Sequence, residues 1–286
     1  MADLAGRLSG QPRGVEASLQ APGWRRTGVP LAIKRAIVIA GLFAAWELLT
    51  GGFGGLMEPM VNQAILPPPS MALADLVEYA RSGLLARDLS ATLRAAFIGL
   101  FLGIAGGLIA GLALGYWRSL ADIVEPVLVA FNSLPRVALA PILIIWFGLG
   151  VTSKIFLSLF TVFFIIFFNT YMGVRSVDPD LVKAIRVMGA TREQIARFVV
   201  MPSVFSWIFA ALRTSVSFAL TGAVVGEFVG ATEGLGYRMA IASGLLNTPR
   251  VFAILLLLMV IGASLVEIAK RVELRLLRWR PVTPLH

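Results

Sequence analysis

The sequence contains no cysteine, and its single histidine is the last residue, His286. Without cysteine the chain can form neither disulfide bonds nor thiolate metal sites. One terminal histidine also removes most histidine-based catalysis and metal binding. Charged residues are scarce as well, at 14% of the 286 residues, against about 25% in ordinary globular domains. These absences argue against a metalloenzyme and against a soluble domain.

Short catalytic signatures are missing too. The phosphate-binding pattern G-x-x-x-x-G-K-[ST] does not occur, because no lysine of the chain follows a glycine. The zinc-protease pattern H-E-x-x-H and the nucleophile pattern G-x-S-x-G are also absent. We therefore expect a chain that is not an enzyme and binds no cofactor or metal ion. Any ATP hydrolysis, with its Mg²⁺, would belong to a partner.

Hydrophobic residues, in contrast, make up 58% of the sequence, against about 45–50% in ordinary domains, and the mean hydropathy is +0.84. A helix that crosses a bilayer needs about 20 mostly apolar residues. Hydropathy predicts six such spans, at about 34–50, 93–116, 123–148, 154–174, 203–229 and 251–269. The expected fold class is an all-α membrane protein.

The net charge of +9 follows this topology. Most Lys and Arg residues fall in the segments that the span count places in the cytoplasm, the positive-inside bias of an inner-membrane protein. We thus expect a multi-pass protein of the bacterial inner membrane with both termini cytoplasmic, surrounded by lipid and binding no nucleic acid. Its parts are a cytoplasmic tail (1–32), a transmembrane domain (33–272, including a charged segment at 178–202) and a second cytoplasmic tail (273–286).

Residues 51–92 are expected outside the membrane. They include "ILPPPS", which is too rich in proline for a helix interior, and the amphipathic stretch 71–89, which we expect to lie on the membrane surface. In the second span, glycines recur at every fourth position and share one helix face, which favours close packing against another helix. They are Gly99, Gly103, Gly107, Gly111 and Gly115.

The third span contains "NSLPRVALAP", in which Pro135 and Pro141 each remove a backbone donor and are expected to break or kink the helix. Arg136 lies between them, and Arg213 lies within the fifth span. Charges inside spans are costly, so each should face protein or a cavity. They either give an anion a favourable passage or, for Arg213, bind the free carbonyls of the broken helix. Candidate pathway residues are Asn132, Ser133, Arg136, Asn169, Arg213, Ser217 and Thr221.

The segment 178–202 reads locally as a helix, a turn and a second helix. Asp178 is a good N-cap, Pro179 fits the first helical position and Gly189 is placed to close the helix in a left-handed conformation. Thr191 and Gln194 form a capping box for the second helix. Apolar residues at helical spacing, Leu181, Ala184, Ile185 and Met188, lie opposite Lys183 and Arg186. This apolar face rests either on the membrane surface or in a groove of another subunit.

The same segment resembles the "EAA" motif of ABC-importer permeases, written E-A-A, three residues, G, nine residues, I, one residue, L-P. With the spacing kept, this chain has Lys183, Ala184, Ile185, Gly189, Val199, Met201 and Pro202. Lys183 reverses the charge of the family's glutamate. In that family the motif forms a coupling helix that docks on an ATPase subunit. The resemblance implies this role here, with coupling residues Leu181, Lys183, Ala184, Ile185, Met188, Gly189, Ala190 and Pro202.

The stretches "ILPPPS", "NSLPRVALAPILIIWFGLG", "VGEFVGATEGLGY" and "RLLRWRP" resemble binding-protein-dependent permeases of the nitrate, sulfonate, taurine and bicarbonate group. The resemblance implies a type I ABC importer permease fold, a second copy of the chain, two ATPase subunits and an extracytoplasmic binding protein. It also implies uptake of a small anion such as a sulfonate, nitrate or bicarbonate by alternating access. A pyrimidine or vitamin precursor is the alternative substrate, and a transporter or channel driven by an ion gradient is the alternative function.

Overall fold

The computed structural model describes residues 30–51 and 59–276. The chain divides after Ala45 into two compact units, and the elements treated below belong to the second unit except for the first part of α1. The described residues form helices, turns and connecting segments without a β-strand, which confirms the all-α class. In chain order the helices are α1 (Leu31–Leu49), α2 (Pro69–Arg81), α3 (Leu84–Tyr116), α4 (Arg118–Asn132), α5 (Leu139–Phe147), α6 (Val151–Arg175), α7 (Pro179–Val187), α8 (Arg192–Ile195), α9 (Met201–Val229), α10 (Leu235–Gly244) and α11 (Thr248–Leu276).

Within the described residues, four helices are long and apolar enough to cross a membrane, namely Leu84–Tyr116, Val151–Arg175, Arg192–Val229 and Thr248–Arg275. A bent pair, Ser119–Asn132 and Arg136–Phe147, makes a fifth candidate span. The predicted first span coincides with α1, which is helical but carries Lys34, Arg35 and Glu47 within its 19 residues. The six expected spans are thus matched by five candidates and one further apolar helix that carries three charged residues.

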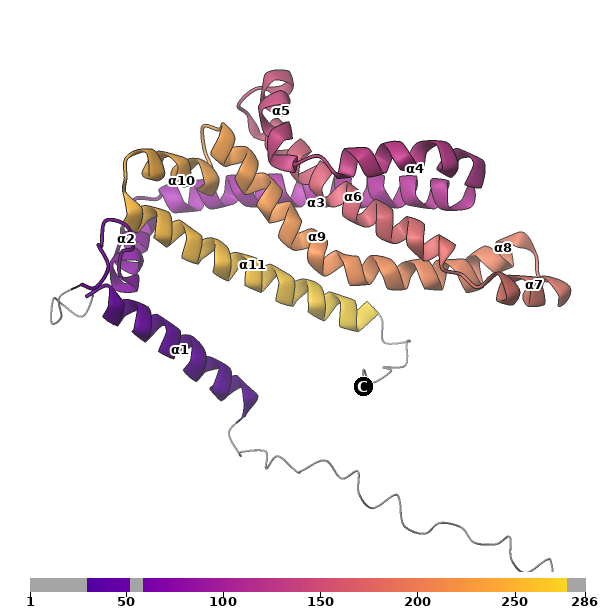
Figure 1. Ribbon diagram of the computed structural model, residues 1–286, viewed down its shortest axis with the longest axis horizontal. Coiled ribbons are helices and arrows are strands. Elements are labelled where there is room, and N and C mark those ends of the chain that lie inside the picture. Colours follow the sequence, from indigo (N-terminus) through magenta and orange to yellow (C-terminus); the bar gives the residue numbers. More distant parts are fainter. Residues whose placement is uncertain (1–29, 52–58, 277–286) are drawn as a thin grey trace, which may run out of the picture. The chain divides into compact units, whose positions relative to one another are not determined.

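The helices α3, α6 and α9 pack against one another and form the core of the second unit (Figure 1). Leu100 of α3, Val162 and Ile166 of α6, and Val216 of α9 meet in one buried cluster. Different short helices lie at the two ends of α9. α9 follows the short helices α7 and α8 at its start and leads into α10 at its end.

The glycine stripe of α3 faces another helix, as the spacing predicts, and that helix is α6. A Cβ atom added at Gly103 would lie 2.9 Å from the carbonyl oxygen of Leu159, and one added at Gly107 would lie 2.7 Å from that of Phe163. Such distances leave no room for a side chain. The glycines therefore allow the two backbones to approach closely, which is a packing function.

The third predicted span is broken, as expected, but at one proline and not two. Between α4 and α5 the chain bends by 84°, and Pro135 precedes the short 3₁₀ turn η1 (Arg136–Ala138) at this bend. Pro141 lies in the first turn of α5, where a missing N–H group has no helical partner to lose. The expectation that Pro141 breaks the helix is therefore wrong.

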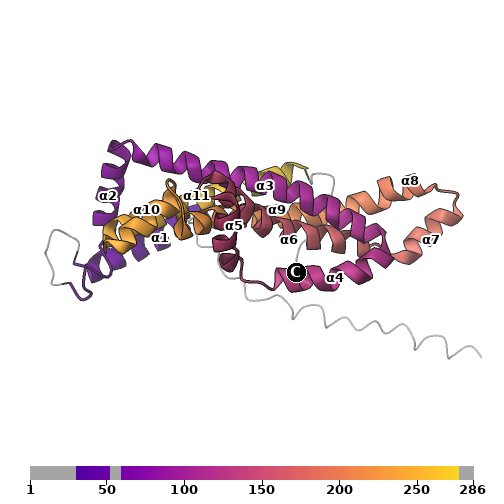
Figure 2. The same ribbon diagram turned by 90° about the horizontal axis from the view of Figure 1, so that it is seen from above.

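The amphipathic stretch 71–89, expected to lie on the membrane surface, is divided between two helices. α2 ends at Arg81, Gly83 adopts a φ of +76°, and α3 already begins at Leu84 (Figure 2). Ala72 and Tyr79 of α2 are fully buried, and α2 packs against α3 and α11. Its apolar residues are thus covered by protein only in part, because Met71, Leu73 and Val77 stay 41%, 52% and 50% exposed.

Candidate functional site

The charged segment forms the predicted helix, turn and second helix. Asp178 caps α7 by accepting a hydrogen bond from the backbone N–H of Asp180 at 2.8 Å. Gly189 follows α7 with a φ of +89°, a conformation that costs other residues energy. In α8, the side chain of Gln194 accepts from the N–H of Thr191 at 2.8 Å, and the Thr191 hydroxyl accepts from the N–H of Gln194 at 3.2 Å. All these local predictions are confirmed.

The second helix does not stop before the next span. A single π-helical turn, η2 (Ala196–Val200), joins α8 to α9, and Pro202 occupies the first turn of α9. The helical path therefore runs without interruption from Arg192 to Val229. The charged segment and the fifth predicted span thus share one helical path.

No side chain of α7 is buried. Leu181 is 48% exposed and Met188 is 84% exposed, and Val187, which the periodicity did not include, is 88% exposed. Ala184 is exposed, while Ile185 and Ala190 are half-buried. Lys183 is exposed and pairs with Asp180 at 2.8 Å. Most of the predicted apolar face is therefore left uncovered by the described chain.

A cavity of about 350 Å³ lies beside the bend between α4 and α5. It brings together Asn132 and Arg136 from the bend and Thr221 from α9, which are among the predicted pathway residues. The Arg136 side chain donates to the Asn132 side-chain oxygen at 3.0 Å and lies 5.8 Å from the centre of the Phe218 ring. Arg136 makes no ion pair within the described residues.

The sequence analysis did not predict the hydroxyl and the aromatic ring that complete the cavity lining. Thr161 of α6 is buried and donates to the carbonyl oxygen of Leu157 at 2.7 Å, and Phe218 of α9 lines the wall. Thr161 lies inside a long apolar run, and Phe218 is itself apolar although it follows the predicted residue Ser217. Only the packing of α6 against α9 places them at a cavity.

The other predicted pathway residues lie outside this cavity. The side chains of Ser133 and Asn169 bond to carbonyl oxygens one turn back along their own helices, and Ser217 does not line the cavity. Arg213 pairs with Glu273 of α11 at 2.8 Å. The expectation that Arg213 binds carbonyls of the broken helix is therefore wrong, because a carboxylate on a neighbouring helix neutralises it.

A buried polar cluster holds the start of α10. Asp88 of α3 is fully buried. It accepts hydrogen bonds from Tyr79 and Arg238, each at 2.6 Å, and from the N–H of Gly234 at 2.9 Å. Burial and the Asp88 carboxylate raise the pKa of Tyr79, so the phenol stays protonated as a donor. The cluster ties α2 and α10 to α3.

Glu227 of α9 completes this cluster. It is 2% exposed and accepts from Thr92 and from the N–H of Gly236, each at 2.9 Å. The hydroxyl of Thr92 accepts in turn from the N–H of Leu235 at 2.9 Å. Asp88, Thr92 and Glu227 thus satisfy the first N–H groups of α10, which a helix start otherwise leaves unpaired. The sequence analysis did not identify Asp88 or Thr92.

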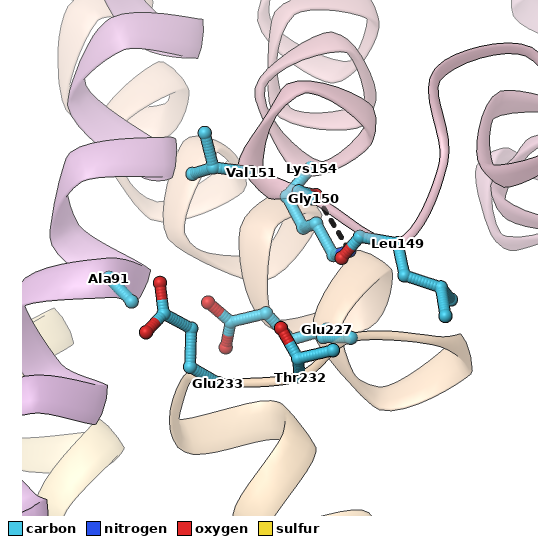
Figure 3. A pocket seen from close by; sticks show the side chains of 9 residues that line it. Ala91, Leu149, Gly150, Val151, Lys154, Glu227, Thr232 and Glu233 are labelled. Carbon is cyan, nitrogen blue, oxygen red and sulfur yellow. Dashed lines mark hydrogen bonds between the residues drawn. The ribbon is translucent and has the colours of Figure 1, made fainter.

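A small cavity of about 50 Å³ adjoins the cluster (Figure 3). Glu227 and Glu233 line it together with Lys154. The Lys154 ammonium is turned back onto the carbonyl oxygens of Leu149 and Gly150, at 2.5 and 2.8 Å (Figure 3). Lys154 therefore closes the loop between α5 and α6.

Residues 103–278 match the family described as the binding-protein-dependent transport system inner membrane component. A riboflavin transport system permease protein of Chloroflexus aurantiacus is 36% identical over 92% of this chain and 93% of its own length. A putative aliphatic sulfonates transport permease protein of Bacillus subtilis is 30% identical over 98% of this chain and 97% of its own. A formylaminopyrimidine transport permease protein of Halalkalibacterium halodurans is 32% identical over 87% and 96%.

Among solved structures, inward-facing forms of the MetNI methionine ABC transporter share the fold. One chain has a TM-score of 0.52 and 24% identity over 66% of this chain and 98% of its own. A second form has a TM-score of 0.55 and 22% identity. Together with the family match and the apolar helices, these relatives show that the chain belongs to the inner-membrane components of binding-protein-dependent transport systems and is a multi-pass ABC importer permease with the type I fold.

Proposed function

We propose that this chain imports a small solute at the expense of ATP hydrolysed by a separate subunit, and that α7 is the helix on which that subunit docks. The uncovered apolar surface of α7 carries the proposal. Leu181, Val187 and Met188 are 48%, 88% and 84% exposed. A helix of nine residues is too short to be stable alone in water. Exposed apolar side chains on a short, capped helix are suited to a groove in a partner protein.

The connections of α7 explain how docking would drive transport. α6 ends at Arg175, just before the Asp178 cap, and α8 continues through η2 into α9. α6 contributes Thr161 and α9 contributes Phe218 to the cavity beside Arg136. A movement of α7 would thus shift two walls of this cavity. Alternating access follows if ATP binding and release move α7 between two positions.

The proposed assembly contains two copies of this chain, two ATPase subunits that bind ATP and Mg²⁺, and an extracytoplasmic binding protein. Both termini and α7 lie on the cytoplasmic side. The family description, which names binding-protein-dependent transport, supports the partner classes. The charge distribution of the sequence supports the orientation.

Arg136 supports an anionic substrate such as a sulfonate, nitrate or bicarbonate. It lines the cavity and has no acidic partner among the described ion pairs, so an anion passing there would neutralise it. The neighbouring Phe218 ring suits a planar pyrimidine or vitamin precursor, the alternative that two of the similar permeases bear in their names. Ligand binding to the companion binding protein distinguishes these classes.

The rival function, transport driven by an ion gradient, requires carboxylates that are free to exchange a proton or Na⁺. Asp88 and Glu227 are buried, but both are engaged by the N–H groups of α10. Glu273 is paired with Arg213. These carboxylates therefore serve the packing of helices.

Uptake in proteoliposomes tests the proposal. Vesicles containing this chain, its ATPase and the binding protein should accumulate the ligand of the binding protein only when ATP is supplied. Vesicles that contain this chain alone should accumulate nothing under an imposed H⁺ or Na⁺ gradient. Accumulation driven by a gradient without the ATPase would overturn the proposal.

A further inference from the structure

A second, larger cavity lies where the ends of α3 and α6 meet α7, α8 and η2. Its volume is about 580 Å³, within the usual range for ligand sites. The residues that line it are Tyr116, Val174, Val177, Pro179, Val182, Lys183, Arg186, Arg192, Ile195, Ala196 and Val200. The solute cavity beside Arg136 shares none of these residues.

The charges around this second cavity have one sign. Lys183, Arg186 and Arg192 line it, and no acidic side chain does. Lys183 pairs with Asp180 on the exposed side of α7. Arg186 and Arg192 take part in no ion pair within the described residues. The site therefore offers positive charge to an anion.

The remaining wall is apolar. Val174 continues the transmembrane helix α6, while Ile195 and Val200 lie on the helical path that becomes α9. Tyr116 lies at the edge, followed by Trp117, which is 64% exposed. Tyrosine and tryptophan mark the boundary between membrane and water. Cations and an apolar wall thus meet at the level expected for lipid headgroups.

We propose that this cavity binds an anionic phospholipid, with the phosphate at Arg186 and Arg192 and acyl carbons along the valine wall. Basic pockets between transmembrane helices are suited to anionic headgroups. A small anion would use the cations and leave the apolar wall without a partner. The exposed side chains Leu181, Val187 and Met188 do not line this cavity, so lipid and ATPase would occupy different sides of α7.

A lipid at this position contacts α7, α8 and the end of α6 together. It would hold α7 at a defined position beneath the spans and would favour the arrangement in which the cavity is filled. Binding itself requires neither ATP nor the ATPase, so this site can be tested independently of the proposed transport function.

The experiment uses the purified full-length chain in detergent, and thermal unfolding is measured with added dioleoyl-phosphatidylglycerol, dioleoyl-phosphatidylcholine or glycerol 3-phosphate. We expect phosphatidylglycerol alone to raise the unfolding temperature. Arg186→Gln and Arg192→Gln should each weaken binding about five-fold, the factor that corresponds to one basic residue at an anionic surface. Arg186→Lys should retain most of the effect because it keeps the charge.

Arg271→Gln provides the matched control, since Arg271 is exposed on α11 and does not line the cavity. It should leave the response to phosphatidylglycerol unchanged. Native mass spectrometry of the same samples counts bound lipids, so the result does not depend on the stability of a variant. Three outcomes would overturn the proposal. They are equal stabilisation by phosphatidylcholine, full replacement of the lipid effect by glycerol 3-phosphate, and an unchanged response in both glutamine variants.

Discussion

At the scale of single residues, Asp88 illustrates how one buried carboxylate organises several helices. Its oxygens bind Tyr79 of α2, Arg238 of α10 and the N–H of Gly234. The side chain of Asp88 is 0% exposed, and that of Arg238 is 26% exposed. Removing one partner of a buried pair is costly because the other charge loses its compensation.

Asp88→Asn should therefore lower the free energy of unfolding by about 3–5 kcal/mol. The variant keeps the size of the side chain, so the loss reflects charge and hydrogen bonding. Thermal unfolding of the purified protein in detergent measures the effect. An unfolding temperature equal to that of the original chain would show that the cluster does not stabilise α10.

Glu233→Gln is the control for Asp88→Asn. Glu233 pairs with Arg87 at 3.0 Å, and their side chains are 39% and 66% exposed. Exposed ion pairs contribute less than about 1 kcal/mol. The control should therefore unfold close to the original temperature.

At the scale of helices, the contact between α3 and α6 depends on the glycine stripe. A Cβ atom at Gly107 would lie 2.7 Å from the carbonyl oxygen of Phe163, whereas one at the adjacent Gly106 would lie 3.4 Å from the Phe163 ring. The first contact is with backbone that cannot move without separating the helices. The second is an ordinary contact with a side chain.

Gly107→Ala should destabilise the protein by about 1–3 kcal/mol, the usual cost of overpacking. Gly106→Ala should be neutral or stabilising by up to about 1 kcal/mol, because alanine favours a helix more than glycine does. Parallel thermal unfolding of the two variants makes the comparison. Equal effects of the two substitutions would rule out a close backbone contact at Gly107.

The turn between α7 and α8 depends on Gly189, whose φ is +89°. No atom lies within 4 Å of a Cβ added there, so a substitution acts through the backbone alone. Gly189→Val should strain the left-handed turn by about 1–2 kcal/mol and reduce ATP-driven uptake. Gly189→Asn should retain most uptake, because asparagine tolerates this conformation. Uptake at matched expression levels is the measurement, and normal uptake by the valine variant would contradict the role of the turn.

Local features of these helices could be predicted from the sequence, and long-range ones could not. The Asp178 cap and the capping box at Thr191 involve groups two or three residues apart, so the chain itself places them together. Glu227 and Thr92 are separated by 135 positions, and Arg213 and Glu273 by 60. No periodicity within one helix indicates which distant helix supplies the partner.

The glycine stripe could be predicted from the sequence only in part. Its spacing of four predicts a face that accepts another backbone, but nothing in α3 indicates that α6 provides it. The lining of the cavity beside Arg136 is only partly predictable for the same reason. Arg136 and Asn132 could be predicted because they are polar residues near Pro135. Thr161 and Phe218 could not, because they reach the cavity only through the packing of α6 against α9.

At the scale of the whole molecule, the membrane class follows from composition, because 58% hydrophobic residues exceed what a soluble domain needs. The number of spans is harder to predict from the sequence. α1 carries three charged residues, and the pair α4–α5 bends by 84°. A hydropathy average over a window of residues detects neither isolated charges nor a bend. The segment 178–202, for which we propose the coupling role, is identifiable in sequence because motif spacing and local caps both point to the same residues.

We propose that α7 receives the work of ATP hydrolysis through the exposed apolar side chains at its end. This proposal is tested most directly by ATP-driven uptake in proteoliposomes that contain the assembled transporter with Val187→Asp and Met188→Asp combined in this chain. Neither side chain has a buried contact to lose, since they are 88% and 84% exposed. We expect an unfolding temperature like that of the original chain and uptake reduced at least ten-fold, together with weaker co-purification of the ATPase. Uptake and ATPase association at the original level would contradict it.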